Sequence, residues 1–507
     1  MSVTDWIKKL IKLIGKIEES FGQENDEALI QELKEAYDLF EGKEKNYLYS
    51  LFIKEFEADS ELYLYILSLI TYITSDMEAA AMAVDYITSN NLSLKDSLYY
   101  ELQLRRRRCN YESYRKIHNF NKEKLQDLFL EEPERIKLQD RNEKSIVVIT
   151  EQILSVNHAP TKNVLDTIYY LHTRFGYKVH LFVCPTKLEK KWDTWYGKLD
   201  LNIWKELNGR NGLEYKDITI DTCQIPLKEE NFDLIREEIQ YIIGLKPHYI
   251  YSMGCINAIP DIFTKVTTVV AQSMDTMFPR SDAQILLKTK SDGAELINSS
   301  WLKKQKLVYF KNPYFLEESD FIKTRKELCL PENQYLIGII GNRLDMEVTG
   351  DFVKKIRTVI EENREVSFVF IGTFSKCGSY FSDFMEQGRI IYLGYQKDLL
   401  SIYPVLNLYW NPPRKGGGIS GLMALKSGVP ILTLPNCDVS YNVGNEFICR
   451  EEEELDVIYR YIHDEEFNKI MRKRCIERYQ EIEAEQFINL TQTITDIEKA
   501  VEEEGIG

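Results

Sequence analysis

Apolar residues recur at two different spacings along the chain, and the change of spacing divides it. Up to about residue 135 they follow helical spacing in the segments 28–40, 47–56, 62–74, 77–88 and 94–108. Proline is absent from residues 1–132, and short polar turns separate the segments. The pattern predicts an all-α domain over residues 1–140. Its role stays open between a surface that binds an acceptor or partner and a scaffold or dimer element.

One more helical pattern, residues 2–20, precedes these segments and has a basic polar face. Its apolar positions include Trp6, Leu10 and Ile17, and lysines lie between them. One interpretation is an amphipathic helix on an anionic membrane surface. The other is a first helix packed on its neighbours, which is the usual meaning of an apolar stripe.

After the charged segment 131–144, short and nearly continuous apolar runs begin. Such runs are typical of buried parallel strands. They occupy residues 145–150, 178–184, 249–253, 267–271, 306–313, 335–341, 366–372, 390–394 and 429–434. Helical patterns at 161–173 and 351–362 lie between them, and about 451–504 is acidic and helical. We therefore predict two Rossmann-like domains, 141–320 and 321–507. The polar stretch 187–231 predicts no element.

Composition narrows the class of protein. The 507 residues are 44% hydrophobic and carry a net charge of −16, which argues against a broad nucleic-acid-binding surface. Nine cysteines without C-x-x-C spacing indicate neither a zinc site nor a disulfide framework, and the histidines show no metal-like spacing. No apolar run is long enough to cross a bilayer and no signal peptide is evident. We expect a cytoplasmic protein, membrane-associated if residues 2–20 bind lipid, and leave a homo-oligomer open.

The most informative stretch runs from Leu408 to Pro435. An apolar run leads into the glycine triplet 416–418, a helical segment starts at Ser420 and stops near Gly428, and a second apolar run follows. Glycines allow a ligand close to the backbone, and a helix start offers free N–H groups. Gly417, Gly418, Ile419 and Ser420 are therefore candidate phosphate ligands, with charge from Lys415 and its neighbour Arg414. The alternative is a tight turn flanked by two solvated cations.

The segment N-P-P-R-K-G-G-G-I-S from residue 411 onward, with G-V-P-I from 428, resembles the donor-site signature of GT-B glycosyltransferases. It is similar to bacterial sugar transferases of glycosyltransferase group 1 and to O-GlcNAc-transferase-like enzymes. The resemblance implies an α/β protein with two Rossmann-like domains facing across a cleft, and final helices that cross back onto the first. It also implies a nucleotide-sugar donor, expected to be UDP-linked, bound by the second domain, and a protein or glycan acceptor on the first. No cofactor or metal is expected.

Loops after predicted strands supply the remaining candidates. Asn157 and His158 resemble the Asn-His-Pro-Thr segment of the O-GlcNAc-transferase-like enzymes, with one residue inserted. The likeness implies a histidine beside sugar and acceptor, where a neutral imidazole can accept a proton. The alternative is a loop histidine bonded locally. Asp275 follows another strand and is a candidate on the acceptor side.

In the second domain, Asn342 and Arg343 follow a strand at the place where the family commonly has a basic contact to the donor diphosphate. Gly394 and Tyr395 occupy the loop that in the family meets the nucleobase through backbone groups.

Two departures from the family pattern keep other functions open. Asp345 and Glu347 stand where many relatives have a second cation, and Met423 stands where many have a carboxylate for the donor ribose. The second hypothesis is therefore a catalytically inactive GT-B-like subunit that binds an acceptor protein or a partner transferase. A third is a sugar-phosphate epimerase of similar fold.

Overall fold

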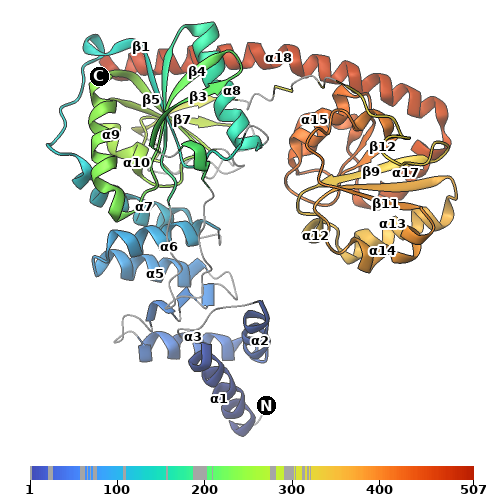
Figure 1. The fold of residues 1–507 in the computed structure, drawn as a ribbon. Coiled ribbons are helices and arrows are strands. Elements are labelled where there is room, and N and C mark those ends of the chain that lie inside the picture. Colours follow the sequence, from blue (N-terminus) through green and yellow to red (C-terminus); the bar gives the residue numbers. More distant parts are fainter. Residues whose placement is uncertain are drawn as a thin grey trace. The chain divides into compact units, whose positions relative to one another are not determined.

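The chain forms two compact units, which are described separately. The computed structural model describes residues 3–20, 27–56, 63–65, 67–68, 70–71, 77–106, 110–155, 158–186, 203–207, 209–273, 281–289, 302, 304–310, 315–316, 319 and 321–506. Unit 1 comprises Met1–Phe310 with Thr493–Gly507, and unit 2 comprises Lys311–Gln492 (Figure 1).

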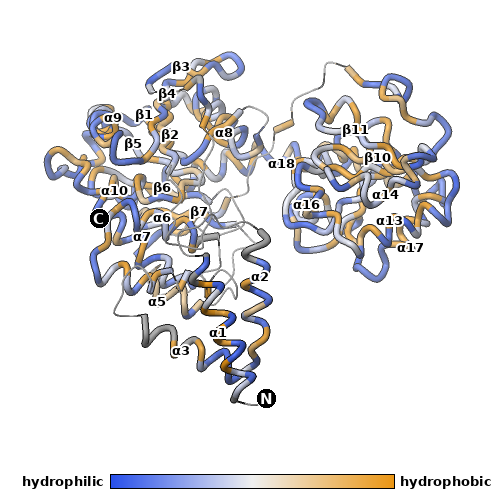
Figure 2. The backbone as a smooth tube through the Cα atoms, turned by 60° about the horizontal axis from the view of Figure 1, so that its bottom comes forward, coloured by the Kyte–Doolittle hydropathy of each residue, from blue (hydrophilic) through white to orange (hydrophobic). Residues whose placement is uncertain are grey.

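Unit 1 begins with helices, as the apolar spacing predicts. They are α1 (Val3–Ser20), α2 (Glu27–Asp38), α3 (Lys43–Phe56), α5 (Met77–Ser89), α6 (Leu94–Arg106) and α7 (Tyr111–Leu125). In α1, Leu13 and Ile17 are buried, whereas Ile7 and Ile11 are 45% and 64% exposed. The exposed Lys8 and Lys12 follow these isoleucines in sequence, so apolar and charged positions alternate along the helix (Figure 2). Within the described part, no helix is long and apolar enough to cross a membrane.

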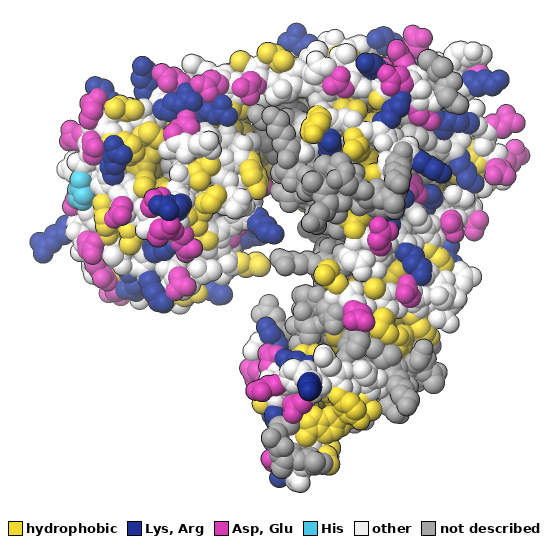
Figure 3. All heavy atoms as spheres, turned by 180° about the vertical axis from the view of Figure 1, so that it is seen from behind, with side chains coloured by type: hydrophobic (Ala, Val, Ile, Leu, Met, Phe, Trp, Pro, Cys, Tyr) yellow, Lys and Arg dark blue, Asp and Glu magenta, His cyan; other side chains and the backbone are white. Residues whose placement is uncertain are grey.

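Charged side chains are spread over the surface. In Figure 3, lysines and arginines are interspersed with aspartates and glutamates on each unit, and the described residues of the visible face form no extended patch of one sign.

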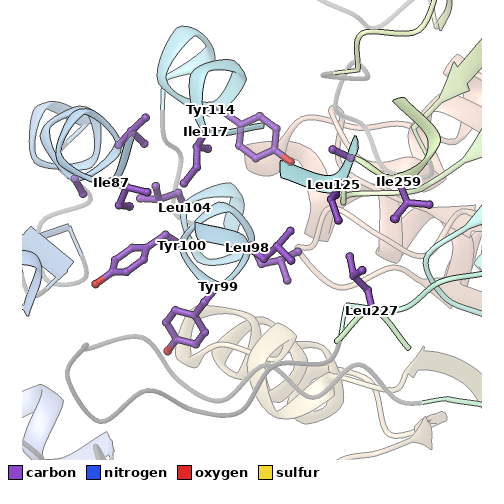
Figure 4. Packing of buried hydrophobic residues seen from close by; sticks show 14 of the residues in the cluster. Ile87, Leu98, Tyr99, Tyr100, Leu104, Tyr114, Ile117, Leu125, Leu227 and Ile259 are labelled. Atoms are coloured by element: carbon purple, nitrogen blue, oxygen red, sulfur yellow. The ribbon is translucent and has the colours of Figure 1, made fainter. Parts of the chain in front are cut away.

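The helices share their core with the sheet that follows. Ile87 of α5, Leu104 of α6 and Ile117 of α7 are fully buried, and Leu125 at the end of α7 lies near Leu227 and Ile259, which belong to the α/β part (Figure 4). All of them belong to one buried cluster. The helical part is therefore packed onto the sheet layer within unit 1.

A buried ionic cluster reinforces this junction. His118 of α7 contacts Glu101 of α6 through Nδ1 at 2.5 Å and Asp261 of α10 (Ile259–Ile262) through Nε2 at 2.7 Å. Burial alone would lower the pKa of His118, but the two carboxylates outweigh it and raise the pKa to about 10. The imidazolium is therefore charged at neutral pH and links three helices.

The sheet of unit 1 contains eight strands within the described residues. They are β1 (Asn142–Thr150), β2 (Lys178–Val183), β3 (Gly209–Tyr215), β4 (Ile218–Gln224), β5 (Pro247–Met253), β6 (Thr268–Gln272), β7 (Ile285–Lys288) and β8 (Lys306–Tyr309). Their order is β3-β4-β2-β1-β5-β6-β7-β8, and β3 pairs antiparallel with β4 while the other pairs are parallel. The hairpin β3–β4 lies within 187–231, where the sequence predicts no element, because β3 is a largely exposed edge strand without an apolar run.

Unit 2 contains a parallel sheet with strands β9 (Tyr335–Gly341), β10 (Val366–Gly372), β11 (Ile390–Gly394), β12 (Leu408–Trp410) and β13 (Ile431–Leu432). The order is β11-β10-β9-β12-β13, the strand order of a Rossmann fold. Connecting helices include α13 (Gly350–Glu362), α14 (Cys377–Glu386), α15 (Gly418–Lys426), α16 (Asp438–Val443) and α17 (Glu454–His463). Trp410 at the end of β12 is fully buried against Phe352 of α13, with ring centroids 4.6 Å apart.

The last helix, α18 (Glu465–Ile506), begins in unit 2 and ends in unit 1. Glu498 accepts hydrogen bonds from the Tyr177 hydroxyl and contacts His248 Nε2 at 2.9 Å, and Glu504 pairs with Arg135. The end of the chain thus packs on the first Rossmann-like sheet, as the family resemblance implies. The predicted α/β class with an all-helical N-terminal part is confirmed.

Candidate functional site

The strand order of unit 2 determines where a ligand can bind. β9 and β12 are neighbours in the centre of the sheet, and the chain leaves them toward opposite edges. At such a switch point the loops at the carboxyl ends of the two strands diverge and leave room for a ligand. Those two loops are residues 342–343, after β9, and 411–417, after β12. Together with the first residues of α15 (Gly418–Lys426), they contain seven of the nine donor-site residues predicted from the sequence.

The loop after β12 ends in a helix start with free N–H groups. Gly417 has φ = +99°, a left-handed conformation that favours glycine, and it caps α15. The N–H of Gly421 donates to the Gly417 carbonyl at 3.2 Å, so the N–H groups of Gly418, Ile419 and Ser420 precede this first helical bond. The helix dipole adds partial positive charge at this end. The arrangement suits an anion such as a phosphate.

Arg343 reaches this loop from the neighbouring strand. It caps the short helix α12 (Leu344–Glu347), and its side chain is 67% exposed. A Cβ atom built on Gly416 would lie 3.2 Å from the Arg343 Nη2 atom. The guanidinium therefore lies beside the glycine triplet, where it can share an anion with the helix start.

Arg414, in contrast, is part of the scaffold. Its side chain is only 6% exposed, and it donates to Glu347 at 3.0 Å, to Asn411 at 2.8 Å and to the Tyr409 hydroxyl at 2.5 Å. A Cβ on Gly417 would lie 2.6 Å from its Nη2. The solvated cation that the sequence allows at position 414 is therefore a wrong interpretation. Arg414 holds the glycine loop in place.

Glu347 joins the two arginines. Its other oxygen lies 3.4 Å from Nε of Arg343, and its side chain is 8% exposed. The sequence presented Glu347 as an acidic neighbour that weakens the cationic site. In the structure it is a buried bridge that orients Arg343 and anchors Arg414.

The other predicted donor residues also lie at the carboxyl ends of the strands of this sheet, but at different distances from the switch point. Asn342 is exposed directly after β9, and Lys415 is exposed within the glycine loop. Gly394 ends β11 with φ = +66°, and Tyr395 is 61% exposed. Because β10 separates β11 from β9, these two residues flank the switch point and are not part of the glycine loop.

His158 lies at the corresponding switch point of unit 1, where β1 and β5 are neighbours. It caps α8 (Ala159–Phe175), and its Nδ1 is 2.9 Å from the Thr161 hydroxyl, which also accepts from the Leu154 N–H. Burial lowers the pKa of His158, so the imidazole is neutral at pH 7. The other acceptor-side candidates, Asn157 and Asp275, lie outside the described residues.

One residue beside the loop was not predicted. Asp438 follows β13, and its N–H donates to the Lys415 carbonyl at 2.7 Å. It is distant in sequence from the glycine triplet, and no local motif marks it. Met423 is partly buried and packs against the core of unit 2. Among the described residues, no group of three or more His, Cys, Asp or Glu side chains could hold a metal ion.

Comparison with known proteins places this geometry in a fold family. No family model matches the sequence, and no curated protein matches it. Among solved structures, a point variant of the O-GlcNAc transferase of Thermobaculum terrenum is similar over 100% of this chain and 99% of its own, with a TM-score of 0.50 and 11% identity. A UDP-forming α,α-trehalose-phosphate synthase from Burkholderia xenovorans matches 71% of this chain and 99% of its own, with a TM-score of 0.46 and 9% identity. The similarity to the O-GlcNAc transferase extends over the full length of both chains, and at 11% identity it is evidence for the fold alone. It agrees with the two Rossmann-like sheets and with the last helix, which returns to the first of them. This chain therefore has the GT-B fold.

Proposed function

We propose that the protein is a glycosyltransferase that moves a sugar from a UDP-sugar to a hydroxyl or amide of a protein or glycan acceptor. The proposal rests on one observation: Arg343 lies beside the glycine triplet and the start of α15, at the switch point of unit 2. An arginine fork beside free backbone N–H groups suits the two phosphates of a nucleotide sugar.

In this reaction the bond between the sugar C1 and the diphosphate oxygen breaks, and a bond from the acceptor oxygen or nitrogen to C1 forms. Charge grows on the leaving diphosphate. The N–H groups of Gly418, Ile419 and Ser420 and the Ser420 hydroxyl stabilise that charge from fixed positions, and Arg343 and Lys415 add positive charge. This stabilisation lowers the barrier because the leaving diphosphate carries more negative charge in the transition state than in the bound substrate.

His158 is proposed to take the acceptor proton. If Nδ1–H donates to the Thr161 hydroxyl, which can accept a second hydrogen bond beside that from Leu154, Nε2 is left as the free acceptor. The lowered pKa keeps the imidazole in the neutral form that a general base requires.

The test is binding and turnover with UDP-sugars. Release of UDP, by hydrolysis or transfer, is measured for the wild type, Arg343→Ala and Ser420→Ala. Arg364→Ala is the matched control, because Arg364 is exposed and lies just before β10. It therefore lies at the amino ends of the strands, opposite to the carboxyl ends where the donor site is proposed. We expect Arg343→Ala to lower kcat/KM by about 10- to 100-fold, the loss of one charge-assisted contact. Equal activity of the wild type, Arg343→Ala and Ser420→Ala would refute the donor site.

A second candidate function is a binding subunit of GT-B fold without catalysis. Two observations favour it: Met423 packs on the core where many transferases hold the ribose, and Glu347 already engages Arg343. Calorimetry separates the two functions, since a binding subunit would take up no UDP or UDP-sugar at millimolar concentration.

A further inference from the structure

The loop after β13 returns to the glycine triplet and brings a carboxylate with it. Asp438 is the first residue of α16, and its N–H donates to the Lys415 carbonyl at 2.7 Å. A Cβ built on Gly418 would lie 3.3 Å from the Cβ of Asp438. Asp438 is thus held against the loop both by its backbone and by contact with Gly418.

The Asp438 carboxylate has no hydrogen bond or ion pair with any described residue, although it is half-buried. Burial raises its pKa, while the positive charges of Arg414 and Arg343 act in the opposite direction. Both arginines are instead bonded to Glu347. The Asp438 oxygens are not among the fully buried polar atoms that lack a partner, so they remain open to a ligand. Because part of the hydration of this carboxylate is lost, hydrogen bonds donated by a ligand would compensate for that loss.

The chemistry of a nucleotide sugar supplies such donors. The ribose and the sugar each carry neighbouring hydroxyls on either side of the diphosphate, and an ionised carboxylate accepts two of them well. Met423, whose thioether is a weak acceptor, packs on the core and offers no replacement. Asp438 lies beside the N–H groups proposed for the phosphates, within reach of hydroxyls adjacent to them.

We propose that Asp438 binds hydroxyl groups of the nucleotide-sugar donor next to its diphosphate and thereby selects for donors that carry them. The inference rests on the proposed function, because it assumes that a nucleotide sugar occupies this loop. The inference gives the segment after β13 a role in donor binding, although this segment lies outside the glycine-loop motif.

Calorimetry on the full chain tests the inference with three ligands: UDP, 2′,3′-dideoxy-UDP and UDP-glucose. The variants are Asp438→Ala and Asp438→Asn, and Asp351→Asn is the control, since Asp351 is an exposed aspartate of the same unit. The side-chain changes leave the N–H of residue 438 free to bond Lys415. Circular dichroism and thermal unfolding confirm that each variant is folded.

If Asp438 binds the ribose, Asp438→Ala weakens UDP by about 10- to 100-fold, the effect of losing hydrogen bonds to a charged group, and leaves the weaker dideoxy-UDP unchanged. If it binds the sugar, UDP is unaffected and only UDP-glucose loses affinity. Asp438→Asn retains part of the binding, because its amide oxygen still accepts. Equal affinities of the wild type and both variants for all three ligands overturn the role of Asp438 alone. A wild type that binds none of them overturns the proposed function as well.

Discussion

Arg414 offers a direct test of how the glycine loop is held. Replacement by methionine keeps much of the side-chain volume but removes the bonds to Glu347, Asn411 and Tyr409. The Glu347 carboxylate, 8% exposed, is then left with the solvent-exposed Arg343 as its remaining charged partner. The perturbation is therefore the loss of one member of a buried ion pair.

The expected cost follows from the burial of the pair. Removing one partner of a buried ion pair destabilises by about 3–5 kcal/mol, because a desolvated charge remains. Arg450 is the matched control: its side chain is 70% exposed and its partners are Glu452 and Glu453 on the surface. For Arg450→Met we expect about 0–1 kcal/mol, the value of an exposed pair.

Variants of Glu347, the ion-pair partner of Arg414, measure the interaction energy of the pair. Glu347→Leu leaves the Arg414 guanidinium buried without its counter-ion. In the double variant Arg414→Met/Glu347→Leu, neither buried charge remains. The double variant should therefore be more stable than the sum of the single losses predicts, by about 1–3 kcal/mol, the coupling expected between contacting residues.

Hydrogen exchange at increasing urea concentration, followed by mass spectrometry of peptides from β9 and β12, gives the free energy of unfolding of unit 2 without interference from unit 1. A cost for Arg414→Met no greater than that for Arg450→Met would contradict the structural role of Arg414. Strict additivity in the double variant would show that the two buried charges do not interact.

Three further outcomes are expected. Gly417→Ala should cost about 1–2 kcal/mol from its left-handed backbone alone and weaken UDP-sugar binding, because the added Cβ meets the guanidinium of Arg414 at 2.6 Å. The control is Gly378→Ala, in open space on α14, which should leave UDP-sugar binding unchanged and cause no loss of stability, since alanine at an unstrained helical position stabilises slightly. The raised pKa of His118 implies a stabilisation that is complete below pH 6.5 and is lost as the pH rises through about 10. The difference in unfolding free energy between the wild type and His118→Gln, measured by urea unfolding of unit 1, should therefore shrink over that pH range. A constant difference would contradict the charge assigned to His118. If α1 lies on membranes, Ile11→Glu should reduce sedimentation of the protein with vesicles of anionic phospholipid without changing its folding, and wild-type protein that stays in the supernatant would exclude this contact.

Much of the fold could be predicted from the sequence, because the patterns that indicate helices, strands and turns lie within short stretches of the chain. β9, β10 and β11 have the bounds that their apolar runs predict. For β9 and β10 the reason is that strands covered on both faces must be apolar almost throughout. The glycine triplet between a strand and a helix likewise identifies its own turn, because both the free N–H groups and the permissive backbone belong to neighbouring residues. The helical start and the tandem α/β pattern were predictable for the same reason.

Only the tertiary structure decided which distant residues share the site. The edge strand β3 was not predicted because four of its seven residues are exposed and its apolar pattern is weak. The burial of Arg414, the bridge through Glu347 and the position of Asp438 depend on strand order, which brings β9, β12 and the end of β13 to one edge of the sheet. A charge run or a single carboxylate has no local signature that separates a solvated side chain from one held in a buried network. Sequence therefore determined most of the elements and the glycine-rich turn, and packing between elements determined the surroundings of the charges near that turn.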